Sequence, residues 1–112
     1  QALICAHPPT ALICCSDAMA LIALHNFHEM GIRVPRDISV IGFGNLLRTE
    51  YASPPLTTVA VPYEQMGAEA VKVLLEEEEK ARFQNGSDTP LRKWQRLQTQ
   101  LMVRRSTGEP LY

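Results

Sequence analysis

The feature that most constrains the fold is a strand–helix–strand pattern within residues 11–43. Residues 11–15 form an unbroken apolar run, which is typical of a strand buried on both faces of a sheet. Ser16 and Asp17 follow, and both are residue types that cap helix N-termini. Residues 18–30 contain no glycine or proline, and Gly31 stands where a helix C-terminal glycine belongs. Residues 38–43 are a second β-rich run, so the pattern predicts an α/β fold: a parallel sheet with flanking helices.

The helix predicted within residues 18–30 has two apolar faces. At about 100° per residue, the face that we expect to cover the sheet contains Met19, Ile22, Ala23, Phe27 and Met30. Leu21 and Leu24 fall on the opposite side, near His25 and His28. A helix that covers one face of a sheet needs one apolar face, so the second set predicts a further partner.

The remaining residues continue the alternation of strands and helices. Residues 56–61 favour a third strand, ended by Pro62. Residues 63–83 favour a second helix, with an apolar stripe formed by Met66, Ala70, Val73 and Leu74. Residues 85–88 predict a turn or a flexible loop, and residues 101–103 predict a last strand.

Composition argues against several classes of partner. Eleven basic residues stand against twelve acidic ones, whereas a nucleic-acid-binding segment carries a basic excess. No apolar run reaches the roughly 18 residues that span a bilayer, and residues 1–10 lack the pattern of a signal peptide. The three cysteines, Cys5, Cys14 and Cys15, indicate reduced cytosolic thiols and not a disulfide framework.

The sequence contains no motif typical of catalysis or of a cofactor. His25 and His28 have a spacing that can bind a metal, but no third ligand lies nearby on the helix. Cys14 and Cys15 would point to opposite faces of a strand, so they could not easily bind one metal ion together. A glycine-rich phosphate loop and a nucleophile elbow are both missing from the sequence. We therefore expect a protein that is not an enzyme and has no cofactor or metal.

The candidate ligand-binding residues follow the first two predicted strands. Ser16 and Asp17 come after the first strand, and Gly44 and Asn45 come after the second. Ligands of open parallel sheets bind beyond the carboxyl ends of the strands, and glycine lets a ligand approach the backbone closely. The alternative is that Ser16 and Asp17 only cap the helix and that Gly44 and Asn45 only turn the chain.

Five segments resemble, in order, those of the LacI/GalR family of transcriptional regulators. They are residues 9–20 (PTALICCSDAMA), residues 31–43 (GIRVPRDISVIGF), residues 55–59 (PLTTV), the helix with Gly67, Ala70, Leu74 and Leu75, and residues 104–107 (RRST). Together they extend over nearly the whole chain.

This resemblance implies a periplasmic-binding-protein-like type I fold of two subdomains, of which the chain contains only part. Residues 1–54 and about 98–112 would belong to the C-terminal subdomain, and residues 55–97 to the N-terminal one. A small sugar-like effector would bind in the cleft, a DNA-binding headpiece would lie outside this chain, and the protein would act in the cytoplasm without contacting a membrane.

The resemblance also implies roles for individual residues. Ser16 occupies a position that hydrogen-bonds the ligand, and Asp17 is the carboxylate beside it, whose main role is expected to be capping. Gly44 stands where sugar-binding members carry an Asp, which leaves Asn45 and nearby backbone to replace it. The helix with Leu21, Leu24 and His28 would form the interface of a homodimer. Two other interpretations remain open here: a fragment of a periplasmic-type sugar-binding transport protein, and an inactive gene remnant.

Overall fold

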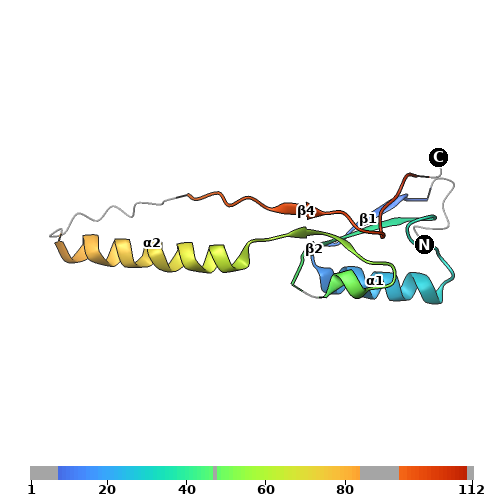
Figure 1. Cartoon of the computed structure of the whole chain (residues 1–112), viewed down its shortest axis with the longest axis horizontal. Coiled ribbons are helices and arrows are strands. Elements are labelled where there is room, and N and C mark those ends of the chain that lie inside the picture. Colours follow the sequence, from blue (N-terminus) through green and yellow to red (C-terminus); the bar gives the residue numbers. More distant parts are fainter. Residues whose placement is uncertain (1–7, 47, 84–93, 111–112) are drawn as a thin grey trace. The chain divides into compact units, whose positions relative to one another are not determined.

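The computed structural model describes residues 8–46, 48–83 and 94–110 (Figure 1). The turn predicted over residues 85–88 lies outside these residues, as does Cys5. The chain divides into two compact units, Gln1–Val61 with Thr99–Tyr112, and Pro62–Gln98. The first unit extends to Val61 because the third strand pairs with the second. The assignment of these units to the subdomains of a complete protein stays a prediction.

The first unit contains a four-stranded sheet with the order β1 (Ala11–Ile13), β2 (Ser39–Gly44), β3 (Thr57–Ala60) and β4 (Gln100–Met102). The first three strands are parallel, with Leu12 opposite Val40 and Ile41 opposite Thr57. The last strand is antiparallel to β3 and places Leu101 opposite Val59. The predicted α/β class is confirmed, with a mixed sheet.

Helix α1 (Asp17–Glu29) connects β1 to β2 and has the ends that the sequence predicts. At its start, the Ser16 hydroxyl accepts a hydrogen bond from the Met19 amide at 3.3 Å. At its end, Gly31 has a φ of +70°, which lets its amide and that of Ile32 bond back to carbonyls of the last turn.

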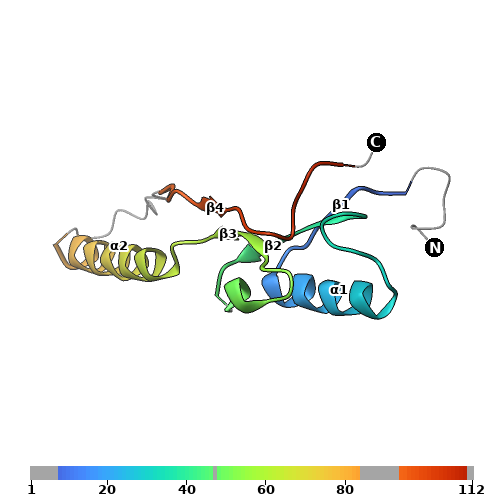
Figure 2. The same cartoon turned by 45° about the vertical axis from the view of Figure 1, so that its right-hand side comes forward.

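The core lies between α1 and one face of the sheet, as the views in Figures 1 and 2 show. Its buried residues are Cys14, Ala20, Leu24, Val40 and Leu56. The predicted orientation of the helix is wrong in part. Ala23 and Phe27 pack against the core as predicted, but Met19 and Ile22 are 53% and 63% exposed, whereas Leu24 is 6% exposed. Apolar side chains occur all around this helix, so periodicity alone does not select the buried face. A polar contact at its first turn, described below, accompanies the face that is buried.

Strand β1 is not buried on both faces, which corrects a second expectation. Leu12 packs against the core, but Ile13 on the other face is 76% exposed. Helix α1 covers only one face of the sheet, and within the described residues β1 is an edge strand.

Residues that follow β4 bridge β2 and β3. Ser106 is fully buried, and its hydroxyl accepts from the Thr57 amide at 2.8 Å and donates to the Val40 carbonyl at 2.6 Å. The Val40 amide in turn donates to the Ser106 carbonyl at 2.8 Å. Ser106, which the sequence indicated only as part of the RRST motif, therefore provides hydrogen-bond partners for backbone groups at the start of β2 and β3.

The second unit contains helix α2 (Tyr63–Phe83), with the predicted bounds. No residue of α2 is buried, and in its predicted apolar stripe Met66 is 46% and Leu74 69% exposed. Gln95 donates to Glu69 at 3.1 Å. Neither α2 nor any other helix in the described part of the chain is long and apolar enough to cross a membrane.

We predict that Gly42→Ala destabilises the first unit by about 1–3 kcal/mol, since overpacking a tight site forces its neighbours to move. A Cβ at this position would press on the Asp17 carboxylate and lie 3.0 Å from Leu56 Cδ2. Denaturant unfolding of the complete protein measures the effect. The control is Gly67→Ala in α2, where nothing lies within 4 Å of the added carbon and a gain of about 0.5–1 kcal/mol is expected. Unchanged stability for Gly42→Ala would contradict the packing described here.

Candidate functional site

The four predicted ligand residues lie at one end of the sheet, where strands β1 and β2 reach their carboxyl ends. The parallel register pairs Ile13 with Ile41. Ser16 comes three residues after Ile13, and Gly44 comes three residues after Ile41. Asp17 and Asn45 come next in the chain. The structure therefore places Ser16 and Asp17 beyond the carboxyl end of β1 and Asn45 beyond that of β2, with Gly44 as the last residue of β2. This is close to the predicted geometry.

Asp17 is nearly fully buried and connects α1 to the sheet. Its Oδ1 accepts a hydrogen bond from the Thr58 hydroxyl on β3 at 2.5 Å, and the side chain is 3% exposed. Ser16, not Asp17, provides the side-chain cap of α1. The expectation that Asp17 mainly caps the helix is therefore wrong, because its side chain turns inward to the sheet. The other carboxylate oxygen, Oδ2, is buried and has no hydrogen-bond partner among the residues that the structure describes.

Gly44 and Asn45 turn the chain with unusual backbone angles. Gly44 is buried with a φ of +122°, and Asn45 is half-buried with a φ of +55°. Glycine adopts the first angle freely, and asparagine tolerates the second better than most residues. The backbone conformation of the turn thus accounts for these two residue types without a ligand. Contact of these residues with a ligand stays a prediction.

The Asn45 side chain belongs to a polar network that sequence reasoning missed. Its Oδ1 accepts from Arg104 Nη2 at 3.1 Å and from the Thr49 hydroxyl at 3.3 Å. Thr49 begins the short helix η2 (Thr49–Tyr51) and is fully buried. Arg104 is a member of the RRST segment, but nothing in the local sequence indicates partners more than 50 residues away.

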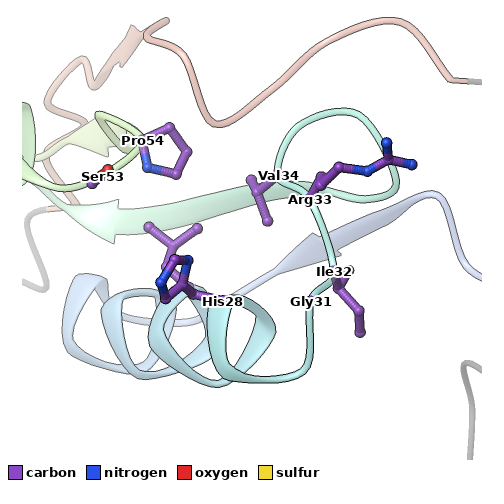
Figure 3. Close-up of a pocket in the computed structure, with 8 residues that line it drawn as sticks. His28, Gly31, Ile32, Arg33, Val34, Ser53 and Pro54 are labelled. Carbon is purple, nitrogen blue, oxygen red and sulfur yellow. The ribbon is translucent and has the colours of Figure 1, made fainter.

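Two cavities lie near the C-terminal half of α1, away from the predicted ligand residues. One of about 440 Å³ is shown in Figure 3 and is lined by Leu24, His28, Gly31, Ile32, Arg33, Val34, Ser53 and Pro54. The other, of about 300 Å³, is lined by Leu21, Leu24, His25, His28, Ala52 and Ser53. Because they share three residues, they form one groove between α1 and the segment after η2.

The predicted interface residues Leu21, Leu24 and His28 all line this groove. Leu24 is nonetheless a core residue and does not lie on a face opposite the sheet, which corrects the earlier placement. Leu21 is half-buried against the core, and His28 is exposed. Their role in a dimer stays a prediction.

Arg33 at the edge of the groove is already paired. Its Nε and Nη2 donate to the two carboxylate oxygens of Asp37 at 2.8 and 2.7 Å. These bonds, with one from the Arg33 backbone amide, lower the pKa of Asp37 to about 2. The carboxylate is thus ionised throughout the neutral range and compensates the charge of Arg33.

Metal-binding and thiol chemistry gain no support from the geometry. Across residues 8–46, 48–83 and 94–110, no group of three or more His, Cys, Asp or Glu side chains is placed to hold a metal ion. Cys14 and Cys15 are free thiols, the first buried and the second exposed. Burial, with a smaller contribution from Cys15, raises the pKa of the Cys14 thiol, which keeps it protonated.

The family model described as a periplasmic binding protein-like domain matches residues 1–107. Among curated proteins, the HTH-type transcriptional repressor CytR of Escherichia coli K12 is 45% identical over 80 residues, which are 71% of this chain and 24% of CytR. The HTH-type transcriptional repressor PurR of Aliivibrio fischeri MJ11 is 52% identical over 68 residues, which are 61% of this chain and 20% of PurR. The chain thus spans about a quarter or less of the length of these relatives.

Solved structures give the same result. A LacI-type transcription regulator from Bifidobacterium animalis subsp. lactis is 39% identical with a TM-score of 0.72, over 90% of this chain and 34% of that one. A LacI family regulator from Lactobacillus casei with bound sucrose is 30% identical with a TM-score of 0.70, over 88% of this chain and 34% of that one. These matches confirm the predicted resemblance and the periplasmic-binding-protein-like fold.

We predict that Asp17→Ala lowers the free energy of unfolding by about 1–3 kcal/mol, because it leaves the buried Thr58 hydroxyl without its partner. Ser16→Ala should cost about 1 kcal/mol through the lost cap, and Ser16→Gly only a few tenths. Denaturant unfolding of the complete protein measures all three. A double-mutant cycle of Asp17→Ala with Thr58→Val serves as the control, and additive losses in that cycle would show that the two side chains are not coupled.

Proposed function

Because this chain belongs to the periplasmic binding protein-like family, as part of the effector-binding domain of a LacI/GalR-type regulator, we propose that the complete protein is an effector-responsive transcriptional regulator. It acts in the cytoplasm, catalyses no reaction and binds DNA through a headpiece outside this chain. The named relatives are repressors, which favours regulation over transport.

The effector proposal rests on the end of the sheet where the parallel strands β1 and β2 terminate side by side. Ser16 and the Gly44–Asn45 turn follow matched positions of two parallel strands, and Gly44 has no side chain to keep a ligand away from the backbone. The sucrose bound to the Lactobacillus casei regulator is the kind of small, hydroxyl-rich molecule that we propose for this site.

The absence of a carboxylate at Gly44 bears on the chemical class of the effector. A carboxylate there, as the resemblance attributes to sugar-binding members, would repel an anionic ligand. Gly44 therefore permits a sugar acid or a phosphorylated sugar, provided that a cationic side chain from outside this chain binds the anion. A neutral sugar held by Asn45 and backbone groups is the alternative, and the titration below separates the two.

The groove along α1 supports a homodimer. Leu21, His25 and His28 line it together with Ala52 and Ser53, and Leu24 lies beneath them. The core of the unit needs Leu24 but leaves Leu21 and both histidines facing a cavity. We propose that a second copy of the protein occupies this groove.

We predict that Leu21→Asp shifts the complete protein from dimer to monomer, because the interface would bury an unpaired charge. Sedimentation velocity measures the mass. The matched control is Ile22→Asp, since Ile22 is 63% exposed and does not line the groove. A dimer that survives Leu21→Asp, or that both variants disrupt equally, would rule out this interface.

The effector proposal is tested by calorimetric titration of the complete protein with neutral sugars, sugar acids and sugar phosphates. If the effector is anionic, Gly44→Asp should weaken its binding by about 1 kcal/mol or more through charge repulsion. The control is Gly44→Asn, which imposes the same backbone strain at a φ of +122° without the charge. Equal binding by the Asp and Asn variants would refute the anionic class, and no binding by any ligand would count against the effector site itself.

A further inference from the structure

Arg104 follows β4 in the sequence, but its side chain joins three other segments of the same unit. Its Nη1 donates to the Thr49 hydroxyl at 2.8 Å and to the Leu56 carbonyl at 2.7 Å. Its Nη2 donates to Asn45 Oδ1 at 3.1 Å. The backbone amide adds a bond to the Thr57 hydroxyl at 2.9 Å. One half-buried guanidinium thus connects the turn after β2, the start of η2 and the start of β3.

The chemistry of the guanidinium fixes which way the Asn45 amide points. Arginine carries only donors, so the atom of Asn45 that faces Arg104 must be the oxygen. The Thr49 hydroxyl accepts from Arg104 and donates to the same oxygen at 3.3 Å. With Oδ1 held by two donors, the N–H groups of Nδ2 are the part of the side chain left for other partners.

We propose that Arg104 is the positioning residue of the Asn45 turn, defined as Gly44 and Asn45 with the η2 residue Thr49. It holds the turn in its left-handed conformation and orients the Asn45 amide so that the turn offers N–H donors. This inference rests on the proposed function in one respect, namely that the turn lines the effector site. In that setting the effector group opposite Asn45 is an acceptor, such as a carbonyl, carboxylate or phosphate oxygen.

The test uses amide hydrogen exchange of the complete, ligand-free protein, so its outcome does not depend on whether an effector is found. The Tyr51 amide donates to the Arg48 carbonyl at 3.1 Å, and the Leu56 amide donates to the Thr49 carbonyl at 2.9 Å. Both report on the network. The Cys14 amide, bonded to the Ile41 carbonyl at 2.8 Å, reports on the rest of the sheet.

In Arg104→Met we expect exchange at Tyr51 and Leu56 to rise about tenfold or more, with less than a twofold change at Cys14. The matched control is Arg105→Met: Arg105 is exposed, and its side chain makes no hydrogen bond to the described residues. It should leave all three amides unchanged. A rise of equal size at all three amides would show a general stabilising role instead of a positioning one. No rise in Arg104→Met, or an equal rise in Arg105→Met, would also overturn the proposal.

Two variants of Asn45 test whether Arg104 needs an acceptor at this position. Asn45→Asp keeps an oxygen facing Arg104 and makes that bond charge-assisted, so exchange at Leu56 should stay the same or slow. Asn45→Ala removes the acceptor and should resemble Arg104→Met. If Asn45→Asp accelerates exchange at Leu56 as much as Asn45→Ala does, an acceptor at position 45 does not hold the network, and the inferred role of Asn45 Oδ1 is wrong.

Discussion

The hydrogen bond between Thr58 and the buried carboxylate of Asp17 ties the first turn of α1 to β3. One oxygen of this carboxylate meets a donor and the other meets none among the described residues, so a rotation of the helix that broke the bond would leave both buried oxygens unpaired. The bonded position of the helix requires Gly42 beneath it, since a side chain there would collide with Asp17. In this position Ala20 and Leu24 go into the core, and Ile22 is left at the surface.

The order of strands and helices was predictable because it depends on local signals, namely the residues that begin and end each element. Ser16 and Gly31 mark the ends of α1 through bonds to amides and carbonyls a few residues away. The rotation of the helix was not predictable, because it involves contacts with residues far away in the sequence, such as Thr58, which is 41 residues from Asp17. The exposure of Ile13 was missed for a related reason: an apolar run indicates a strand but does not reveal how many faces of that strand are covered.

The candidate site divides in the same way. The predicted topology placed Ser16 and the turn at Gly44 at the same end of the sheet, because the carboxyl ends of parallel strands lie together. It could not assign Asp17 to the sheet, nor include Arg104, whose partners are 48 to 59 residues away in the sequence. Long polar side chains reach across a fold in ways that periodicity does not record, so networks of this kind become visible only in three dimensions.

The bridge made by Ser106 has a consequence for the order in which the protein is synthesised. The Val40 carbonyl and the Ser106 hydroxyl are 66 residues apart in the sequence, and Ser39 and Gly108 are 69 apart. The whole of the unit Pro62–Gln98 is translated between these partners. On the ribosome, the backbone groups of Val40 and Thr57 therefore bond to water until residues 106–108 emerge. Contacts of such long sequence separation form slowly, and the interval is one in which a chaperone would find exposed strands to bind.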